Sequence, residues 1–93
     1  MTAEPAEWDV QLSGPAQRDL NRLPPKVAAA VVEFVTGVLP GNPHRLSKEL
    51  TNDLAGVRSA RRGDYRVLFE LHDDTHVLLV IRIDHRAHVY RPR

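Results

Sequence analysis

The sequence predicts an α+β fold in which a four-stranded sheet carries two helices on one face. Residues 7–13 alternate apolar and polar side chains, residues 15–39 carry apolar side chains at helical spacing, and the second half alternates again. Alternation indicates a strand with one buried face, whereas a repeat near 3.6 residues indicates an amphipathic helix. A chain of 93 residues has too little surface to bury for two cores, so we expect one domain over residues 1–93.

The N-terminal segment Glu7–Ser13 is expected to be the first strand. Its buried side would be formed by Trp8, Val10 and Leu12. Ser13 can then cap a helix and Pro15 suits the first turn, so a short helix should follow and end before the prolines at 24 and 25.

A second helix is predicted to begin at Pro25 and to end at Pro40 and Gly41. Its apolar stripe consists of Val27, Val31, Phe34, Val35 and either Val38 or Leu39. Residues 41–56 mix turn-forming residues with leucines, which indicates either a loop with a helical turn or a frayed helix.

Three strands are expected in the C-terminal half. They are Val57 to Arg61 or Arg62, Tyr65 to His72, and His76 to His85. The connections at Gly63–Asp64 and Asp73–Thr75 are too short to join parallel strands, so the three strands should form an antiparallel meander. The helices would then cover one face of the sheet.

The pattern of apolar residues in the last two strands predicts their register. Burying Phe69 beside Leu79, and Leu71 beside Val77, leaves a three-residue loop and places Arg66 directly opposite Arg82 on the other face. A two-residue turn at 63–64 would also place Arg61 opposite Arg66.

Basic side chains are therefore expected to gather on the face away from the helices. Beyond the predicted strand pairs, the same parity adds Arg86, His88 and Tyr90 to this face. Like charges directly opposite each other destabilise a sheet, and a bound phosphate would offset that cost.

Composition supports an anionic ligand and excludes several kinds of chemistry. The chain has no cysteine, which excludes disulfides and thiol catalysis. Up to His44 there are three basic and five acidic residues, and after it ten basic and seven acidic ones. This asymmetry indicates a polyanion such as nucleic acid. The sequence has no apolar run long enough to span a membrane and no leader pattern, so we expect a cytoplasmic protein without membrane contact.

Two motifs point to a known family. The segments RRGDYRVLFEL (61–71) and HVLLVIRIDHRAHVY (76–90), behind a strand and a helical hairpin, resemble the RelE toxins of the RelE/ParE superfamily of toxin–antitoxin systems. The resemblance implies a RelE-like fold and a ribosome-dependent mRNA endonuclease that cuts in the A site without metal or cofactor. It also implies a RelB-like antitoxin as partner, and operator DNA bound by the complex through that antitoxin.

The resemblance also assigns site residues. Arg66 matches the arginine after GDY, Arg86 that of HR, and Tyr90 the tyrosine of VY, while His85 stands where relatives carry lysine or histidine. The expected catalytic residues are Arg66, Arg86, Tyr90, His88 and His85, and the expected phosphate-binding residues are Arg58, Arg61, Arg82 and Arg91. Arginines suit the phosphate, and Tyr90, His88 and His85 stay open as the group that moves the proton.

One departure from the family leaves two alternatives open. Val57 and Ser59 occupy positions at which relatives often carry basic residues, for which Arg58 and Arg61 could substitute. The alternatives are a ParE-like protein that inhibits gyrase by binding, and a catalytically weakened toxin that acts through its antitoxin.

Overall fold

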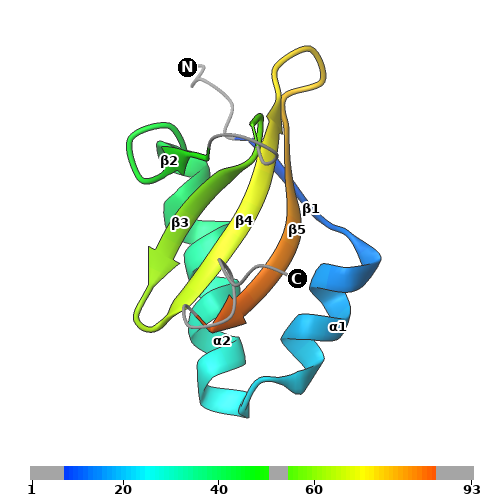
Figure 1. Cartoon of the computed structure of the whole chain (residues 1–93), viewed down its shortest axis with the longest axis vertical. Helices are drawn as coiled ribbons and strands as arrows, with labels where there is room; N and C mark the ends of the chain where they lie inside the picture. The colour runs from blue at the N-terminus through cyan, green and yellow to red at the C-terminus, as the bar shows by residue number, and fades with distance from the viewer. Residues whose placement is uncertain (1–7, 51–54, 86–93) are drawn as a thin grey trace, which may run out of the picture.

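The computed structural model describes residues 8–50 and 55–85, and these contain the predicted order of a strand, a helical hairpin and a meander (Figure 1). The helices are α1 (Gly14–Arg22) and α2 (Pro25–Glu33), and the strands are β1 (Asp9–Leu12), β2 (Lys48–Glu49), β3 (Arg58–Arg62), β4 (Tyr65–His72) and β5 (Val77–His85). The sheet has five strands in the order β1-β5-β4-β3-β2, so the prediction of four strands missed β2. Strand β1 pairs with β5 in parallel, and the other neighbours are antiparallel.

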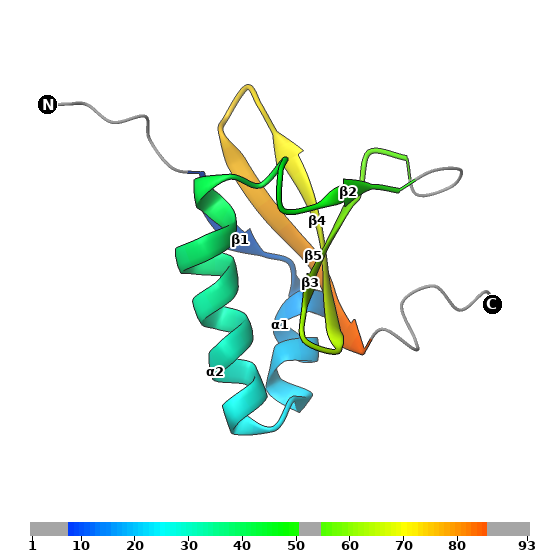
Figure 2. The same ribbon diagram turned by 90° about the vertical axis from the view of Figure 1, so that its left-hand side faces the viewer.

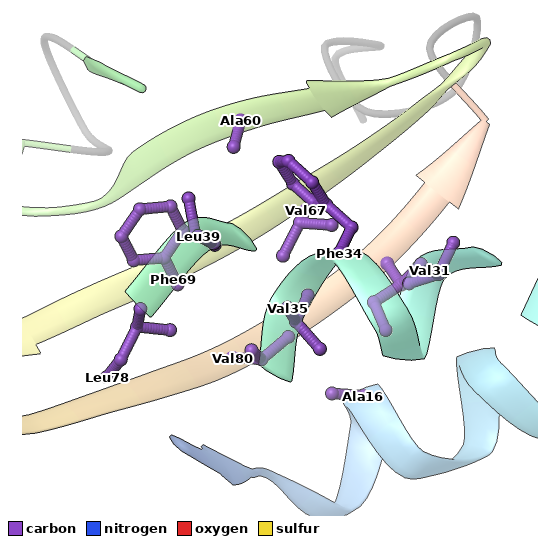
Figure 3. Close-up of a cluster of buried hydrophobic side chains, with 11 residues drawn as sticks. Ala16, Val31, Phe34, Val35, Leu39, Ala60, Val67, Phe69, Leu78 and Val80 are labelled. Carbon is purple, nitrogen blue, oxygen red and sulfur yellow. The ribbon is translucent and has the colours of Figure 1, made fainter. Parts of the chain in front are cut away.

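The molecule has two layers, because both helices cover the same face of the sheet (Figure 2). The predicted α+β architecture is therefore confirmed. Between the layers lies a cluster of buried apolar side chains (Figure 3), namely Ala16, Val31, Phe34, Val35, Leu39, Ala60, Val67, Phe69, Leu78, Val80 and Ile83. The face of the sheet away from the helices is called the open face below. No helix within residues 8–50 and 55–85 is long and apolar enough to cross a membrane.

Ser13 joins the start of α1 to the sheet. Its hydroxyl accepts a hydrogen bond from the N–H of Ala16 at 3.1 Å, which confirms the predicted N-cap. The same hydroxyl donates to the carbonyl of Ile81 at 3.0 Å, and the N–H of Ser13 donates to the carbonyl of Val80 at 2.9 Å. The helix therefore begins at a fixed place along β5.

The predicted register between β4 and β5 is wrong. Leu71 lies opposite Leu78 and Phe69 opposite Val80, one residue away from the prediction, and the connecting loop is correspondingly longer. After Val80 the register shifts once more, so that Arg66 lies opposite Asp84 rather than Arg82. The sequence was ambiguous because residues 77–81 are apolar at both parities, so either side of the strand could have been the buried one.

The register shift is a β-bulge at Ile81, the residue whose carbonyl Ser13 binds. The bulge changes the alternation along β5. Before it the even-numbered Leu78 and Val80 are buried, and after it the odd-numbered Ile83 is buried. The predicted burial of Val77 and Leu79 is therefore wrong, because neither is among the buried residues.

The end of α2 resolves one alternative that the sequence left open. After Glu33 the chain continues as a π-helical turn over Phe34–Val38 and a 3₁₀ turn over Leu39–Gly41. Leu39 is fully buried and Val38 is exposed, so Leu39 completes the apolar stripe. A single turn follows, closed by the hydrogen bond from the N–H of Leu46 to the carbonyl of Asn42 at 3.1 Å, and it leads into β2.

Candidate nucleic-acid interface

The open face contains a hollow of about 510 Å³ whose described lining carries four cations and two hydroxyl groups. It is lined by Arg45, Leu46, Ser47, Lys48, Ser59, Arg61 and Arg66. These residues come from the turn before β2, from β2 itself, from β3 and from β4. None of the described residues that line it is acidic. We call it the basic hollow.

Arg61 and Arg66 both line the basic hollow. They are direct cross-strand partners on β3 and β4, as the sequence predicted. The two-residue turn between these strands contains Gly63, whose positive φ of 63° suits a tight hairpin. Two guanidinium groups on neighbouring strands repel each other, and each can offer paired N–H groups to the oxygens of one phosphate. The pair therefore suits an anionic ligand.

Arg66 has an acidic cross-strand neighbour on its other side. Its partner on β5 is Asp84, whereas the sequence placed Arg82 there. Opposite charges on directly paired positions attract each other, so Asp84 offsets part of the positive charge at this edge of the open face.

Arg82 binds Asp19 of α1. Its Nε donates to one carboxylate oxygen of Asp19 at 2.7 Å and its Nη2 to the other at 3.3 Å. This hydrogen bonding, together with attraction to Asp19 and Asp84, raises the pKa of Arg82 against a smaller opposing effect of burial. Arg82 is absent from the described lining of the basic hollow, so the predicted juxtaposition with Arg66 is not formed.

Asp19 is one of the two buried polar residues in the described part of the chain. Besides Arg82, it accepts a hydrogen bond from the N–H of Ile83 at 2.9 Å. At this point β1 has already ended, so the carboxylate provides the acceptor that a neighbouring strand would otherwise supply. Sequence reasoning missed Asp19, although its position in the same helical stripe as Ala16 and Leu23 is a signal, because a carboxylate there needs a buried partner.

Arg58 anchors the turn before β2. Its Nε donates to the hydroxyl of Ser47 at 2.7 Å and its Nη2 to the carbonyl of His44 at 3.2 Å, while Nη1 lies 3.9 Å from the carboxylate of Glu49. Because Arg58 is paired with Phe69, whose side chain is in the core, it points to the side opposite the basic hollow. The structure therefore does not bring Arg58 together with Arg61 and Arg66.

The remaining predicted residues divide into two groups. His85 is paired with Tyr65, and their rings make an edge contact with centroids 5.5 Å apart. Since Arg66 is adjacent to Tyr65 in the strand, His85 lies on the opposite side of the sheet from Arg66. The others lie outside the described residues, and they are Arg86, His88, Tyr90 and Arg91.

Arg45 and Lys48 are the two cations of the described lining that sequence reasoning did not select. The two residues of β2 are too few to show any alternation, so the segment gave no sign of a strand. The available signal was charge, because both cations belong to the basic part of the chain that follows His44.

Comparison with known proteins identifies the family. A family model described as the ParE toxin of the type II toxin–antitoxin system parDE matches residues 10–90. The chain is 54% identical to Toxin RelE of Mycobacterium tuberculosis over 84 residues, which cover 90% of this chain and 87% of that protein. It is 46% identical to Toxin RelG of the same organism over 84 residues, covering 90% and 97% of the two chains.

A solved structure shares both sequence and fold. A chain in the crystal structure of the toxin–antitoxin complex RelBE2 from M. tuberculosis has 44% identity and a TM-score of 0.84, covering 87% of this chain and all of that one. The five-stranded sheet with its helical hairpin, the match over residues 10–90 and these identities agree. This chain therefore belongs to the RelE/ParE family of type II toxin–antitoxin toxins.

Proposed function

We propose that this toxin is a ribosome-dependent endonuclease that cleaves mRNA in the ribosomal A site and so inhibits translation. The observation that carries the proposal is the basic hollow, in which Arg61 and Arg66 lie directly opposite each other among further cations and hydroxyl groups. A cationic surface whose described lining includes no acidic residue suits the phosphate backbone of RNA. The identity to a protein named Toxin RelE favours the RNA-cleaving branch of the family.

RNA supplies its own nucleophile, the 2′-hydroxyl. The protein then has to align that oxygen with the phosphorus, stabilise the additional negative charge and protonate the leaving 5′-oxygen. In this proposal Arg66 and Arg86 bind the scissile phosphate, because a guanidinium stays charged and can donate two parallel hydrogen bonds. Arg61 binds the same or the next phosphate from β3.

Proton transfer is assigned to Tyr90 and His88. Tyrosine has an unperturbed pKa near 10, so it acts as a base only where cations stabilise its anion, whereas histidine titrates near neutral pH. His85 is the weaker candidate because it is paired with Tyr65 on the other side of the sheet. Arg82 and Arg58 are likewise assigned to structural contacts rather than to RNA.

The test uses ribosomes programmed with a defined message. After incubation with the full-length chain, mapping of message 3′ ends should show cleavage in the A-site codon. Arg66→Ala and Arg86→Ala should reduce the cleavage rate by about 10²-fold or more, as removal of a charge-stabilising group does in other enzymes. Arg18→Ala, on α1 at the other face of the sheet, is the matched control and should cleave like the wild type. Absence of A-site cleavage by the wild type would refute the proposal.

A second candidate is inhibition of DNA gyrase by binding. It is favoured by the description of the matching family model, which names the ParE toxin of parDE. Relaxed plasmid accumulating with gyrase and ATP, together with intact message on ribosomes, would select this function. If neither activity occurs and the antitoxin still binds, the chain is a catalytically weakened toxin.

The proposed partner is a RelB-like antitoxin. The related M. tuberculosis chain was crystallised as the toxin–antitoxin complex RelBE2, which supports a complex of the same kind here. Acidic or amphipathic antitoxin segments would suit the cations of the open face. Operator DNA would be bound by the complex through the antitoxin, and the toxin is proposed to act in the cytoplasm.

A further inference from the structure

We propose that the turn before β2 and β2 itself form a second wall of the RNA-binding site, in which Lys48 and Arg45 bind phosphate groups of single-stranded RNA. Arg58 acts on this wall as a positioning residue and does not contact the RNA. The inference rests on the proposed function for its substrate, and it assigns binding to a segment that the sequence indicated to be a loop or frayed helix.

Lys48 lies where β3 lacks a cation. Its Cα partner in the sheet is Ser59, so both side chains are on the open face. Ser59 is buried and flanked on β3 by Ala60, while Lys48 is exposed. Since directly paired side chains have Cβ atoms about 5 Å apart, the flexible stem of Lys48 can bring its ammonium group over Ser59. Lys48 thus supplies from β2 the charge that Ser59 does not.

Arg45 adds a second cation on the same side. It is exposed and lines the basic hollow together with Ser47 and Lys48, as the Arg61–Arg66 pair also does. The volume of about 510 Å³ lies within the range of about 300–1,000 Å³ typical of small-molecule pockets, and the hollow is open to solvent. A nucleotide with its two flanking phosphates is of the size that such a site accommodates, and four cations of the described lining are available to bind the phosphates.

Arg58 holds this wall from the other side of the sheet. Three of its contacts go to the turn, namely Ser47 Oγ at 2.7 Å, His44 O at 3.2 Å and Ser47 O at 3.4 Å. Only 19% of its side chain is exposed, and Nη1 also lies 3.9 Å from Glu49. Ser47 is the link, because its hydroxyl binds Arg58 and the carbonyl of Pro43 at 2.6 Å while the residue itself lines the basic hollow.

The binding test uses a short single-stranded RNA with 2′-O-methyl groups, which removes the nucleophile and prevents cleavage. Its dissociation constant is measured at several salt concentrations with the full-length chain. Each phosphate contact contributes about 0.7 to the slope of log affinity against log salt for single strands. Lys48→Gln and Arg45→Gln should each lower that slope by about 0.7, which corresponds to about fivefold weaker binding at 0.1 M salt. Lys48→Arg keeps the positive charge, so it should have the salt slope and the RNA affinity of the wild type.

Matched controls remove the same charge elsewhere. Lys26 and Arg18 are exposed residues of α2 and α1. Lys26→Gln and Arg18→Gln should leave the salt slope of RNA binding unchanged. If Lys48→Gln and Arg45→Gln behave like these controls while wild-type chain still cleaves ribosome-bound message, the inference is wrong and the proposed function stands. If wild type binds RNA through these residues but cleaves no message, the proposed function fails and the binding wall stands.

A double-mutant cycle tests the role of Arg58. If Arg58 acts through the wall, Arg58→Ala should weaken RNA binding in the wild-type background and have no further effect in Arg45→Gln/Lys48→Gln. Additive losses would mean that Arg58 contacts the RNA itself, which would overturn its positioning role. Ser47→Ala removes only the hydroxyl that links Arg58 to the wall. It should weaken RNA binding in the wild-type background and have no further effect in Arg45→Gln/Lys48→Gln, so it provides the same test if Arg58→Ala fails to fold.

Discussion

The carboxylate of Asp19 receives Arg82 Nε at 2.7 Å and the N–H of Ile83 at 2.9 Å, and so replaces the missing neighbour of β5 beyond the end of β1. These contacts join Asp19 to two residues of β5 that lie 63 and 64 positions later in the sequence. Together with Ser13, which binds the carbonyl of the bulged Ile81, Asp19 makes α1 the element that fixes the second half of β5.

Replacing Asp19 by alanine should destabilise the fold. The side chain is only 6% exposed, and its loss leaves the N–H of Ile83 without its acceptor, which costs about 1–3 kcal/mol. Asp19→Asn keeps an oxygen in place and should cost less. The free energy of unfolding in urea measures both, and equal stability of Asp19→Ala and wild type would contradict this account.

The contribution of Arg82 to stability should not change between pH 7 and pH 9. The hydrogen bond to Asp19 raises the pKa of Arg82 in the folded state, so the stabilisation is fully present below the unfolded pKa and is lost only as pH rises through the higher folded one. Both lie far above neutrality. The loss of unfolding free energy in Arg82→Gln, measured in urea at the two pH values, should be the same. A loss that shrinks at pH 9 would be inconsistent with this.

Leu78 and Leu79 distinguish the observed register from the one that the sequence favoured. Leu78 is fully buried against the helices, whereas Leu79 is half-buried on the open face. Leu78→Ala should therefore cost about 2–5 kcal/mol of stability. Leu79→Ala should cost clearly less. The free energy of unfolding of the two variants, measured by heat or urea, decides between the observed and the predicted register of β4 and β5. The reverse order would support the predicted register.

Arg61 should bind RNA at some expense of stability. It lies directly opposite Arg66, and like charges at paired positions destabilise a sheet by a few tenths to about 1 kcal/mol. Arg61→Met keeps the apolar stem, so it should preserve or slightly raise the free energy of unfolding while weakening RNA binding by about fivefold at 0.1 M salt. A variant that is less stable yet binds RNA normally would show that Arg61 has a structural role instead.

Much of the fold could be predicted because local patterns specify it. Ser13 as N-cap, the start of α2 at Pro25, the bounds of β4 and the Arg61–Arg66 pair follow from capping, proline placement, alternation and turn length. Each depends on residues close in the sequence. Strand β2 could not be predicted, since two residues carry no period and it exists only because β3 pairs with it.

The sequence by itself determined the α+β order of elements, the apolar stripe of α2, and the motif that identifies the family. Only the tertiary structure decided which side of β5 is buried, because residues 77–81 are apolar at both parities and the choice depends on contacts of β5 with Ser13 and with the buried core. It likewise decided which cations share a surface. Arg82 is bound to Asp19 of α1 and Arg58 to Ser47, whereas Lys48 lies beside Ser59 through strand pairing. All three arrangements depend on contacts between different elements of the fold.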